Sequence, residues 1–212
     1  MARTAVLTKD QILEAAFNLM NSSGAESITI RSIAKALNKS TAPIYTQYPS
    51  HEAIMTDLEI YVGHQLEKNI QTPRTIDGFK NIGLGILDFA LSYKAAFAYY
   101  YLTTKKTQNF FPTDKDMLLN QMKANDMLTV LDDDQLLQLL DDMWVYTYGL
   151  ATMICTGIET SDSLDYYSDK LGQMGHKTIS YYLYSTGKYD AYLQKFIGKV
   201  AKHIDLEEVL RS

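Results

Sequence analysis

The segment 29–48, TIRSIAKALNKSTAPIYTQY, constrains the fold more than any other part of this 212-residue chain. If Ile30 is counted as its first position, the fifth is Ala34, the ninth is Asn38 and the fifteenth is Ile44. Two short helices that cross closely need a small side chain at the fifth position and an apolar one at the fifteenth. The turn between them needs a residue that accepts a positive φ, which glycine does best and asparagine tolerates. The segment therefore predicts a helix-turn-helix.

Local capping residues support this register. Thr29 is placed to cap the first helix through its hydroxyl group, and Ser40 is placed to cap the second. Pro43 falls in the first turn of the second helix, where the missing amide hydrogen breaks no bond. The second helix of such a unit enters the DNA major groove, so the segment favours a DNA-binding regulator over an ordinary pair of amphipathic helices.

The flanking segments predict a helix on each side of this unit. Residues 8–21 begin with a capping-box spacing and carry apolar residues on one helical face, and Gly24 is expected to stop that helix. Downstream, Pro49 ends the second helix of the motif, and Ser50 is placed to cap a long helix that starts at His51.

This order of elements resembles the amino-terminal domain of the TetR family, the tetracycline-repressor-like regulators of bacteria. The resemblance is specific over residues 8–58 and only architectural beyond them. Asn38 stands where the family usually has a glycine, and His51 stands where it usually has a lysine that approaches a DNA phosphate. The matching residues are Ile12, Ala15, Ala16, Gly24, Thr29, Ile33, Ala34, Ser40, Ile44, Tyr45, Tyr48 and Ile54.

The resemblance implies a set of DNA contacts. The residues expected to face the bases are Arg31, Thr41, Ala42, Pro43, Thr46 and Gln47. The residues expected to hold phosphates are Thr29, Lys39, Ser40, Tyr45 and His51. One helix-turn-helix offers too few contacts for a specific site, so we expect a homodimer on an inverted-repeat operator of double-stranded DNA.

The composition predicts an all-α protein with two domains. Four prolines and 11 glycines leave long helical stretches, and no segment alternates apolar and polar residues over the length of a strand. We expect a helix-turn-helix DNA-binding domain over residues 1–52 and a larger helical bundle for effector binding and dimerisation over residues 53–212. The DNA-binding domain carries five basic and four acidic residues, so its net charge is +1. Because the whole chain has a net charge of −5, the helical bundle carries −6. A local positive surface on an acidic body is compatible with DNA binding.

Seven helices are expected after the motif, and a Phe-Phe-Pro-Thr-Asp stretch at residues 110–114 is the clearest interruption. The expected ranges are 51–69, 75–92, 93–106, 114–129, 134–157, 162–186 and 189–210. In the resembled family the last two long helices of the body form a four-helix dimer interface. The alternative is that both are core helices of a monomer. The small residues that would allow close approach in a dimer are Gly149, Ala151, Gly172 and Gly175.

The resemblance also implies that the body binds a small-molecule effector. The chain has 16 tyrosines and seven phenylalanines, which suit a pocket wall but equally suit a plain core. The residues expected to contact an effector are Phe89, Tyr93, Trp144 and Tyr148.

The arginine count bears on the chemistry of that effector. Only Arg74 and Arg211 follow the DNA-binding segment, so the body has few of the bidentate groups that favour anions. We therefore expect a neutral or cationic, aromatic or lipophilic effector, although Lys94, Lys105 and Lys106 leave an anion open.

Two other classes of protein compete with a ligand-controlled regulator. One is a dimeric co-regulator of the same fold that responds to a protein partner. The other is an all-α, metal-dependent enzyme that uses Asp132, Asp133 and Asp134. This triplet stands at a helix start, where one aspartate would cap and the charge suits the helix dipole. The four histidines lack ligand spacing, so we expect no metal, no other cofactor and no catalysis.

The cellular setting follows from further absences in the sequence. The single cysteine, Cys155, excludes an internal disulfide. No cleavable leader and no apolar run of about 20 residues is found, so we expect a cytoplasmic protein with no membrane partner.

Overall fold

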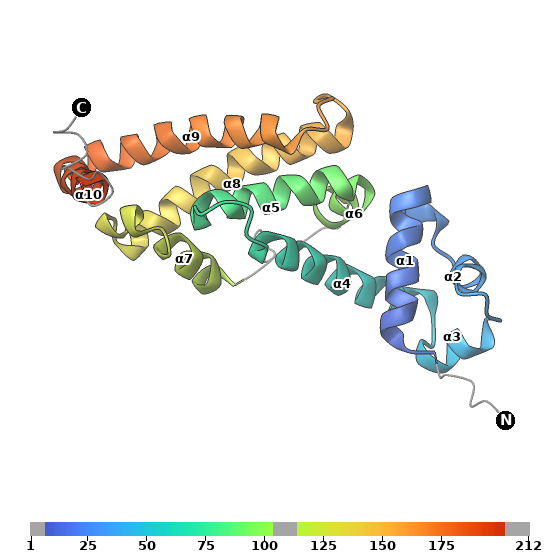
Figure 1. Cartoon of the computed structure of the whole chain (residues 1–212). Helices are drawn as coiled ribbons and strands as arrows, with labels where there is room; N and C mark the ends of the chain where they lie inside the picture. Colours follow the sequence, from blue (N-terminus) through green and yellow to red (C-terminus); the bar gives the residue numbers. More distant parts are fainter. Residues whose placement is uncertain (1–6, 104–113, 202–212) are drawn as a thin grey trace, which may run out of the picture.

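The computed structural model describes residues 7–103 and 114–201, and these residues form helices and no strand. Four helices build the amino-terminal end of the molecule (Figure 1): α1 (Lys9–Ser23), α2 (Ile30–Ala36), α3 (Ala42–Gln47) and α4 (His51–Gln71). The first three pack together as a headpiece, and α4 leads from the headpiece into the rest of the molecule. The prediction of an all-α protein is confirmed.

The remaining helices form a layered body in which α5 is central. This helix packs against α4 on one side and against α8 and α9 on the other, and α10 crosses the far end of α9 (Figure 1). The elements of the body are α5 (Gly78–Ser92), α6 (Lys94–Ala98), the π-helical turn η2 (Tyr99–Thr103), α7 (Lys115–Lys123), the 3₁₀ turn η3 (Asp126–Val130), α8 (Asp133–Thr156), α9 (Leu164–Ser185) and α10 (Tyr189–Ala201).

Most of the helix starts are set by capping side chains, as the sequence predicted. Thr8 and Gln11 form a capping box at α1, and Thr29 accepts a hydrogen bond from the Ser32 amide at α2. Ser50 accepts one from the Ala53 amide at the start of α4. These bonds satisfy amide groups that a helix start would otherwise leave without a partner.

Two of the predicted helices are not single α-helices in the structure. The range 93–106, described as far as Thr103, begins as the short helix α6 and continues directly as the π-helical turn η2, and the Ala96 amide donates to the Asn21 side chain of α1 at 3.2 Å. The range 114–129 splits into α7 and η3, because the Asn125 side chain accepts from the Met127 amide and starts a new turn.

Some predictions fall outside the residues that the structure describes. These concern Lys105 and Lys106, the interruption at residues 110–114 up to Thr113, and the end of the last predicted helix after residue 201. Within the described part, no single helix is long and apolar enough to cross a membrane. The bent pair of α5 with residues 94–103, at an angle of 112°, meets the length and composition criteria together.

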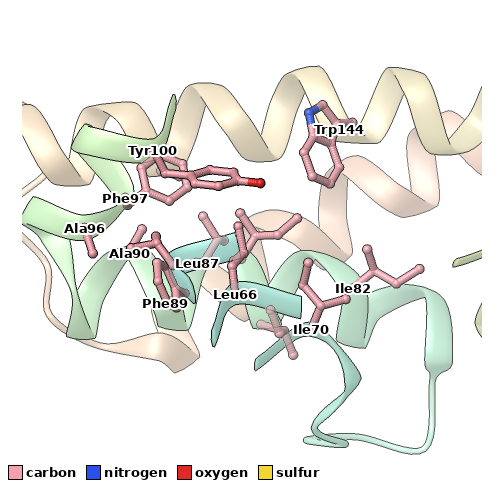
Figure 2. Packing of buried hydrophobic residues seen from close by; sticks show 14 of the residues in the cluster. Leu66, Ile70, Ile82, Leu87, Phe89, Ala90, Ala96, Phe97, Tyr100 and Trp144 are labelled. Atoms are coloured by element: carbon pink, nitrogen blue, oxygen red, sulfur yellow. The ribbon is translucent and has the colours of Figure 1, made fainter. Parts of the chain in front are cut away.

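The core joins α4, α5, η2 and α8. Figure 2 shows Leu66 and Ile70 of α4 facing side chains of α5, with Tyr100 and Trp144 closing the cluster from the other side. Gly85 of α5 allows the two helices to approach, because an added Cβ would lie 2.5 Å from the Cα of Ile70.

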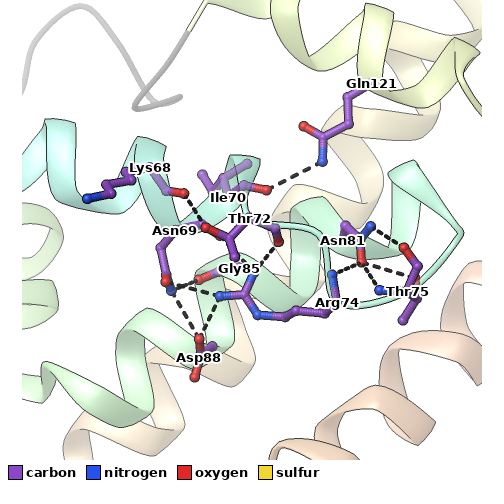
Figure 3. Close-up of polar contacts among 10 residues, drawn as sticks. All are labelled: Lys68, Asn69, Ile70, Thr72, Arg74, Thr75, Asn81, Gly85, Asp88 and Gln121. Atoms are coloured by element: carbon purple, nitrogen blue, oxygen red, sulfur yellow. Dashed lines mark hydrogen bonds and ion pairs between the residues drawn. The ribbon is translucent and has the colours of Figure 1, made fainter.

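A polar clamp fixes the same two helices (Figure 3). The Arg74 guanidinium donates to the carbonyl oxygens of Asn69 and Thr72, both at 2.7 Å, and so satisfies two acceptors at the end of α4. It also donates to the Asp88 carboxylate of α5 at 2.6 Å. The side-chain amide of Asn69 completes the clamp by donating to the Gly85 carbonyl at 2.8 Å. The angle between α4 and α5 is thus held by both packing and charge.

Candidate DNA-binding surface and body cavity

The turn between α2 and α3 has the geometry that the sequence predicted. Asn38 has a φ of +51°, the one positive value among non-glycine residues in the described part of the chain. Its amide donates to the Lys35 carbonyl, and the Lys39 amide donates to the Ala34 carbonyl. This pair of bonds is a Schellman motif, in which the residue after the helix takes the left-handed conformation. Asn38 therefore adopts the left-handed conformation that glycine usually adopts in such turns.

Apolar residues seal the crossing of the two short helices. Ile33, Ala34 and Ile44 are buried, as their positions in the motif require. Tyr48 closes the end of α3, and its burial raises the pKa of the phenol well above its ordinary value. The Lys9 ammonium lies 4.5 Å from the centre of the Tyr48 ring and 3.2 Å from the Asp57 carboxylate. These contacts fix α3 to α1 and α4, so the outer face of α3 is held rigidly.

The start of α3 differs from the prediction. Its capping position is Thr41 rather than Ser40, and no side chain caps it. Thr41 already has helical φ and ψ, and its carbonyl accepts from the amides of Ile44 and Tyr45. Ser40 is exposed one residue before the cap. The predicted capping role of Ser40 is therefore wrong, and its hydroxyl is left facing solvent.

The residues expected to contact DNA lie on the outside of this unit. Tyr45 is 54% exposed. Arg31, Lys39, Ala42 and Thr46 are exposed as well. Those that are partly covered are Thr41, Pro43, Gln47 and His51. Thr29 is exposed, although its hydroxyl already takes part in the capping box of α2.

Three cations of the headpiece form no ion pair with another described residue. Arg31, Lys35 and Lys39 are exposed, and none of the carboxylates in residues 7–103 and 114–201 forms an ion pair with them. Lys9, in contrast, pairs with Asp57. An unpaired surface cation costs little desolvation energy when it meets a phosphate, so these three residues are suited to bind a polyanion.

His51 has a structural contact that the sequence did not reveal. Its Nε2 atom lies 2.9 Å from the carbonyl oxygen of Ile28, which joins the start of α4 to the chain just before α2. With Nε2 donating to this carbonyl, only Nδ1 faces other partners, and Nδ1 donates to a phosphate only when the ring is protonated.

The headpiece is thus a rigid helix-turn-helix with an exposed second helix and with cations that no carboxylate of the described residues pairs, which is the arrangement of a DNA-binding protein. Residues 12–58 match the family model described as "Bacterial regulatory proteins, tetR family". These residues form a TetR-family helix-turn-helix DNA-binding domain at the amino-terminal end of the chain. A search of curated proteins found no matching relative.

The family match of residues 12–58 is to regulatory proteins and not to enzymes. The acidic triplet has structural roles: the Asp132 side chain caps α8, and Asp133 pairs with Lys123 at 2.6 Å. Among the residues described, no three His, Cys, Asp or Glu side chains are placed to hold a metal. Burial raises the pKa of the Cys155 thiol to about 11, which disfavours the reactive thiolate.

The body contains a cavity of about 220 Å³ between α5, α8 and α9. Its walls are mainly apolar and include Ile82, Ile86 and Leu140. The Trp144 ring points from α8 towards α5, where Ile82 lies (Figure 2). The cavity exceeds the 150 Å³ or so that holds one benzene ring in an engineered protein, so it has room for a small organic ligand.

Of the four residues expected to contact an effector, only Trp144 lines this cavity. Tyr148 lies in an aromatic cluster, 5.6 Å from Tyr101 between ring centres. Phe89 packs on Tyr93, and Tyr93 packs on Phe17 of α1 at 5.0 Å, so this pair joins the body to the headpiece. An effector contact by Phe89, Tyr93 or Tyr148 stays a prediction.

The small residues expected at a dimer interface lie in different places. Ala151 and Gly175 are buried, and an added Cβ at Gly175 would lie 3.9 Å from the Met143 methyl group. Gly172 and Gly175 line the cavity. Gly149 is exposed and faces open space. Gly149 is therefore the member of this set that a second subunit can reach.

Proposed function

We propose that this regulator is a repressor that binds an inverted-repeat operator in the cytoplasm as a homodimer and is released by a small-molecule effector. The exposed face of α3, flanked by Arg31 and Lys39, which form no ion pair within the described part of the chain, carries the DNA-binding part of this proposal. Phosphate contacts would supply most of the affinity, and contacts from α3 would supply the choice of sequence.

Gln47 and Tyr45 test the assignment of DNA contacts. We expect Gln47 at the end of α3 to contact a base edge, so Gln47→Ala should lose about 1–3 kcal/mol on the preferred operator and relax preference at one base pair. Tyr45→Phe removes only a hydroxyl from an exposed side chain and should weaken specific and random DNA alike. Both are measured by titration of labelled operator and random duplex. Equal losses on the two duplexes for Gln47→Ala would show that Gln47 does not read sequence.

Exposed apolar groups on the two longest helices of the body support the dimer. Val145 of α8 is 65% exposed and Tyr181 of α9 is 66% exposed, and Gly149 lies one turn beyond Val145. Contiguous apolar patches on helices are typical of surfaces that a partner covers, and we infer that these residues belong to one such patch. The dimer would have a mass near 48 kDa, twice 24.0 kDa, and place its recognition helices about 34–36 Å apart.

Val145→Arg combined with Gly149→Arg tests this interface. Both changes point into open space in the single chain, so folding should be retained while the dimer is lost. Analytical ultracentrifugation should report the mass of one chain, and operator affinity should fall with it. Gly175 is not suited to this test, because its substitution would disturb packing within one subunit. Tight operator binding by a monomeric variant would contradict the dimer.

The body cavity supports control by a ligand over control by a protein partner. An apolar space of about 220 Å³ inside the body costs packing energy, which a ligand would repay. The mechanism would be a shift of population: DNA binds better to one arrangement of the two headpieces, and the effector binds better to another. A thermal-shift screen followed by operator release tests it, since an effector should raise the melting temperature and lower DNA affinity together.

A further inference from the structure

We propose that the ligand of the body cavity is a small apolar molecule with one anionic head group, such as a carboxylate, which binds the Lys80 ammonium. This inference rests on the proposed effector control, and it names the chemical class of the effector. It differs from the neutral or cationic class that the low arginine count favoured.

The position of Lys80 carries the inference. Lys80 lies on the first turn of α5 and lines the cavity. An added Cβ at Gly172 of α9 would lie 3.6 Å from the Lys80 amine, so the amine reaches across the mouth of the cavity to the facing helix. No carboxylate of the described residues pairs with this amine, although it is partly buried. A partly buried ammonium without a counter-ion is a binding partner for an anion.

The other polar groups on the lining are already satisfied or also favour an anion. The Asp77 carboxylate accepts from the amides of Phe79 and Lys80 and from the Asn125 side chain, within 3.2 Å in each case. Its charge is therefore balanced by the start of α5. Thr147 donates its hydroxyl to the Met143 carbonyl at 2.7 Å. His176, on the same lining, carries a ring N–H that can donate a hydrogen bond to an anion.

The rest of the cavity sets the shape of the ligand. Beyond the mouth the walls are aliphatic or aromatic, with Ile82, Ile86, Leu140 and Leu171 among them. A volume of about 220 Å³ suits one aromatic ring with a short chain. A single lysine is a point charge and not a planar fork, so it suits one carboxylate and does not require the arginine pairs that bind larger anions.

A matched set of three probes tests the class. We choose 4-phenylbutyrate, 4-phenylbutanamide and 4-phenylbutylamine, which share a ring and chain and differ in the charge of the head group. Calorimetric titration should show that the carboxylate binds at least about tenfold more tightly than the amide and the amine. Methyl labelling of methionine should show a shift of the Met143 resonance on binding, because Met143 lines the cavity.

Two variants locate the head group. Lys80→Met keeps most of the length of the side chain but removes its charge, so carboxylate affinity should fall to that of the amide while amide affinity stays the same. Lys177→Met is the control, because Lys177 is exposed on α9 and does not line the cavity. It should leave all three affinities unchanged. Lys80→Gln serves as a second neutral variant if Lys80→Met does not fold.

Several outcomes would overturn the inference. In the calorimetric titration, these are binding of the amide or the amine as tightly as the carboxylate or more tightly, and no binding of any probe at millimolar concentration. In the variants and the labelling experiment, they are a preference for the carboxylate that survives both Lys80 variants, and binding that does not shift the Met143 resonance. Operator affinity is measured separately. A carboxylate that binds as expected without changing operator affinity would leave the inference standing and count against effector control.

Discussion

The headpiece and the body place their functional residues in opposite ways. In the headpiece the core is closed, and the candidate DNA contacts point outwards from two short helices. In the body the candidate ligand site is an internal space that three long helices must leave unfilled. A surface site can be altered with little effect on folding, whereas a cavity and the helices around it share the same packing contacts. Function and stability should therefore separate in the headpiece and be linked in the body.

The largest effect is expected where α4 and α5 meet. Gly85→Ala would place a Cβ 2.5 Å from the Cα of Ile70 and 2.7 Å from the carbonyl oxygen of Asn69, and these backbone atoms cannot move independently. We expect a loss of about 3 kcal/mol in the free energy of unfolding, measured in urea. Gly198→Ala on α10 is the matched control, because it meets open space and should gain up to about 1 kcal/mol. Similar effects at the two sites would show that α4 and α5 do not approach so closely.

The same substitution at two arginines compares the regions directly. Arg74→Met removes four hydrogen bonds and leaves the partly buried Asp88 carboxylate without its cation, so we expect a loss of about 2–3 kcal/mol in stability. Arg31→Met removes an exposed cation and should change stability by no more than about 0.5 kcal/mol while weakening DNA binding. Urea unfolding gives the change in stability of each variant, and operator titration gives the change in DNA affinity of each. A large stability loss for Arg31→Met would contradict the proposed separation of function and stability in the headpiece.

A smaller effect is expected at the turn of the helix-turn-helix. Asn38 has a φ of +51°, which glycine adopts without strain. Asn38→Gly should therefore change the free energy of unfolding by less than about 1 kcal/mol, whereas Asn38→Ala should lose about 1 kcal/mol because alanine adopts the left-handed conformation less readily than asparagine. Thermal melting of the two variants compares them. Equal melting temperatures would show that the left-handed conformation is not maintained.

The smallest effect concerns pH and the start of α8. The Gln135 amide and the Lys188 ammonium lower the pKa of Asp132 below its ordinary value. A lowered folded-state pKa stabilises the protein above the unfolded pKa of about 3.9, and this stabilisation is lost as the pH falls through the lower folded value. Asp132→Asn keeps a capping side chain but has no charge. Its melting temperature should lie below that of the wild type at pH 7, and the difference should shrink below about pH 4. A difference that does not depend on pH would exclude the charge as its cause.

Local sequence signals determined most of the headpiece. The capping box of Thr8, the cap at Thr29 and the positive φ of Asn38 all involve residues within a few positions of one another. The error at Ser40 has a local cause as well, since Ser40 and Thr41 are adjacent capping types and the sequence does not distinguish them. In the structure Thr41 is the capping position, because its carbonyl accepts the first amide hydrogen bonds of α3.

The body shows what the sequence alone could not determine. Its aromatic residues suggested a pocket near Phe89 and Tyr93, but those rings pack towards Phe17 of α1, more than 70 positions earlier in the chain. The cavity instead joins α5 with α8 and α9, and a single lysine at its mouth changes the chemistry of the ligand that we propose. Helix starts and turns depend on bonds between near neighbours, so residue types at fixed spacing predict them. A cavity depends on which helix faces pack together over long distances in sequence, and only the tertiary structure fixes that choice.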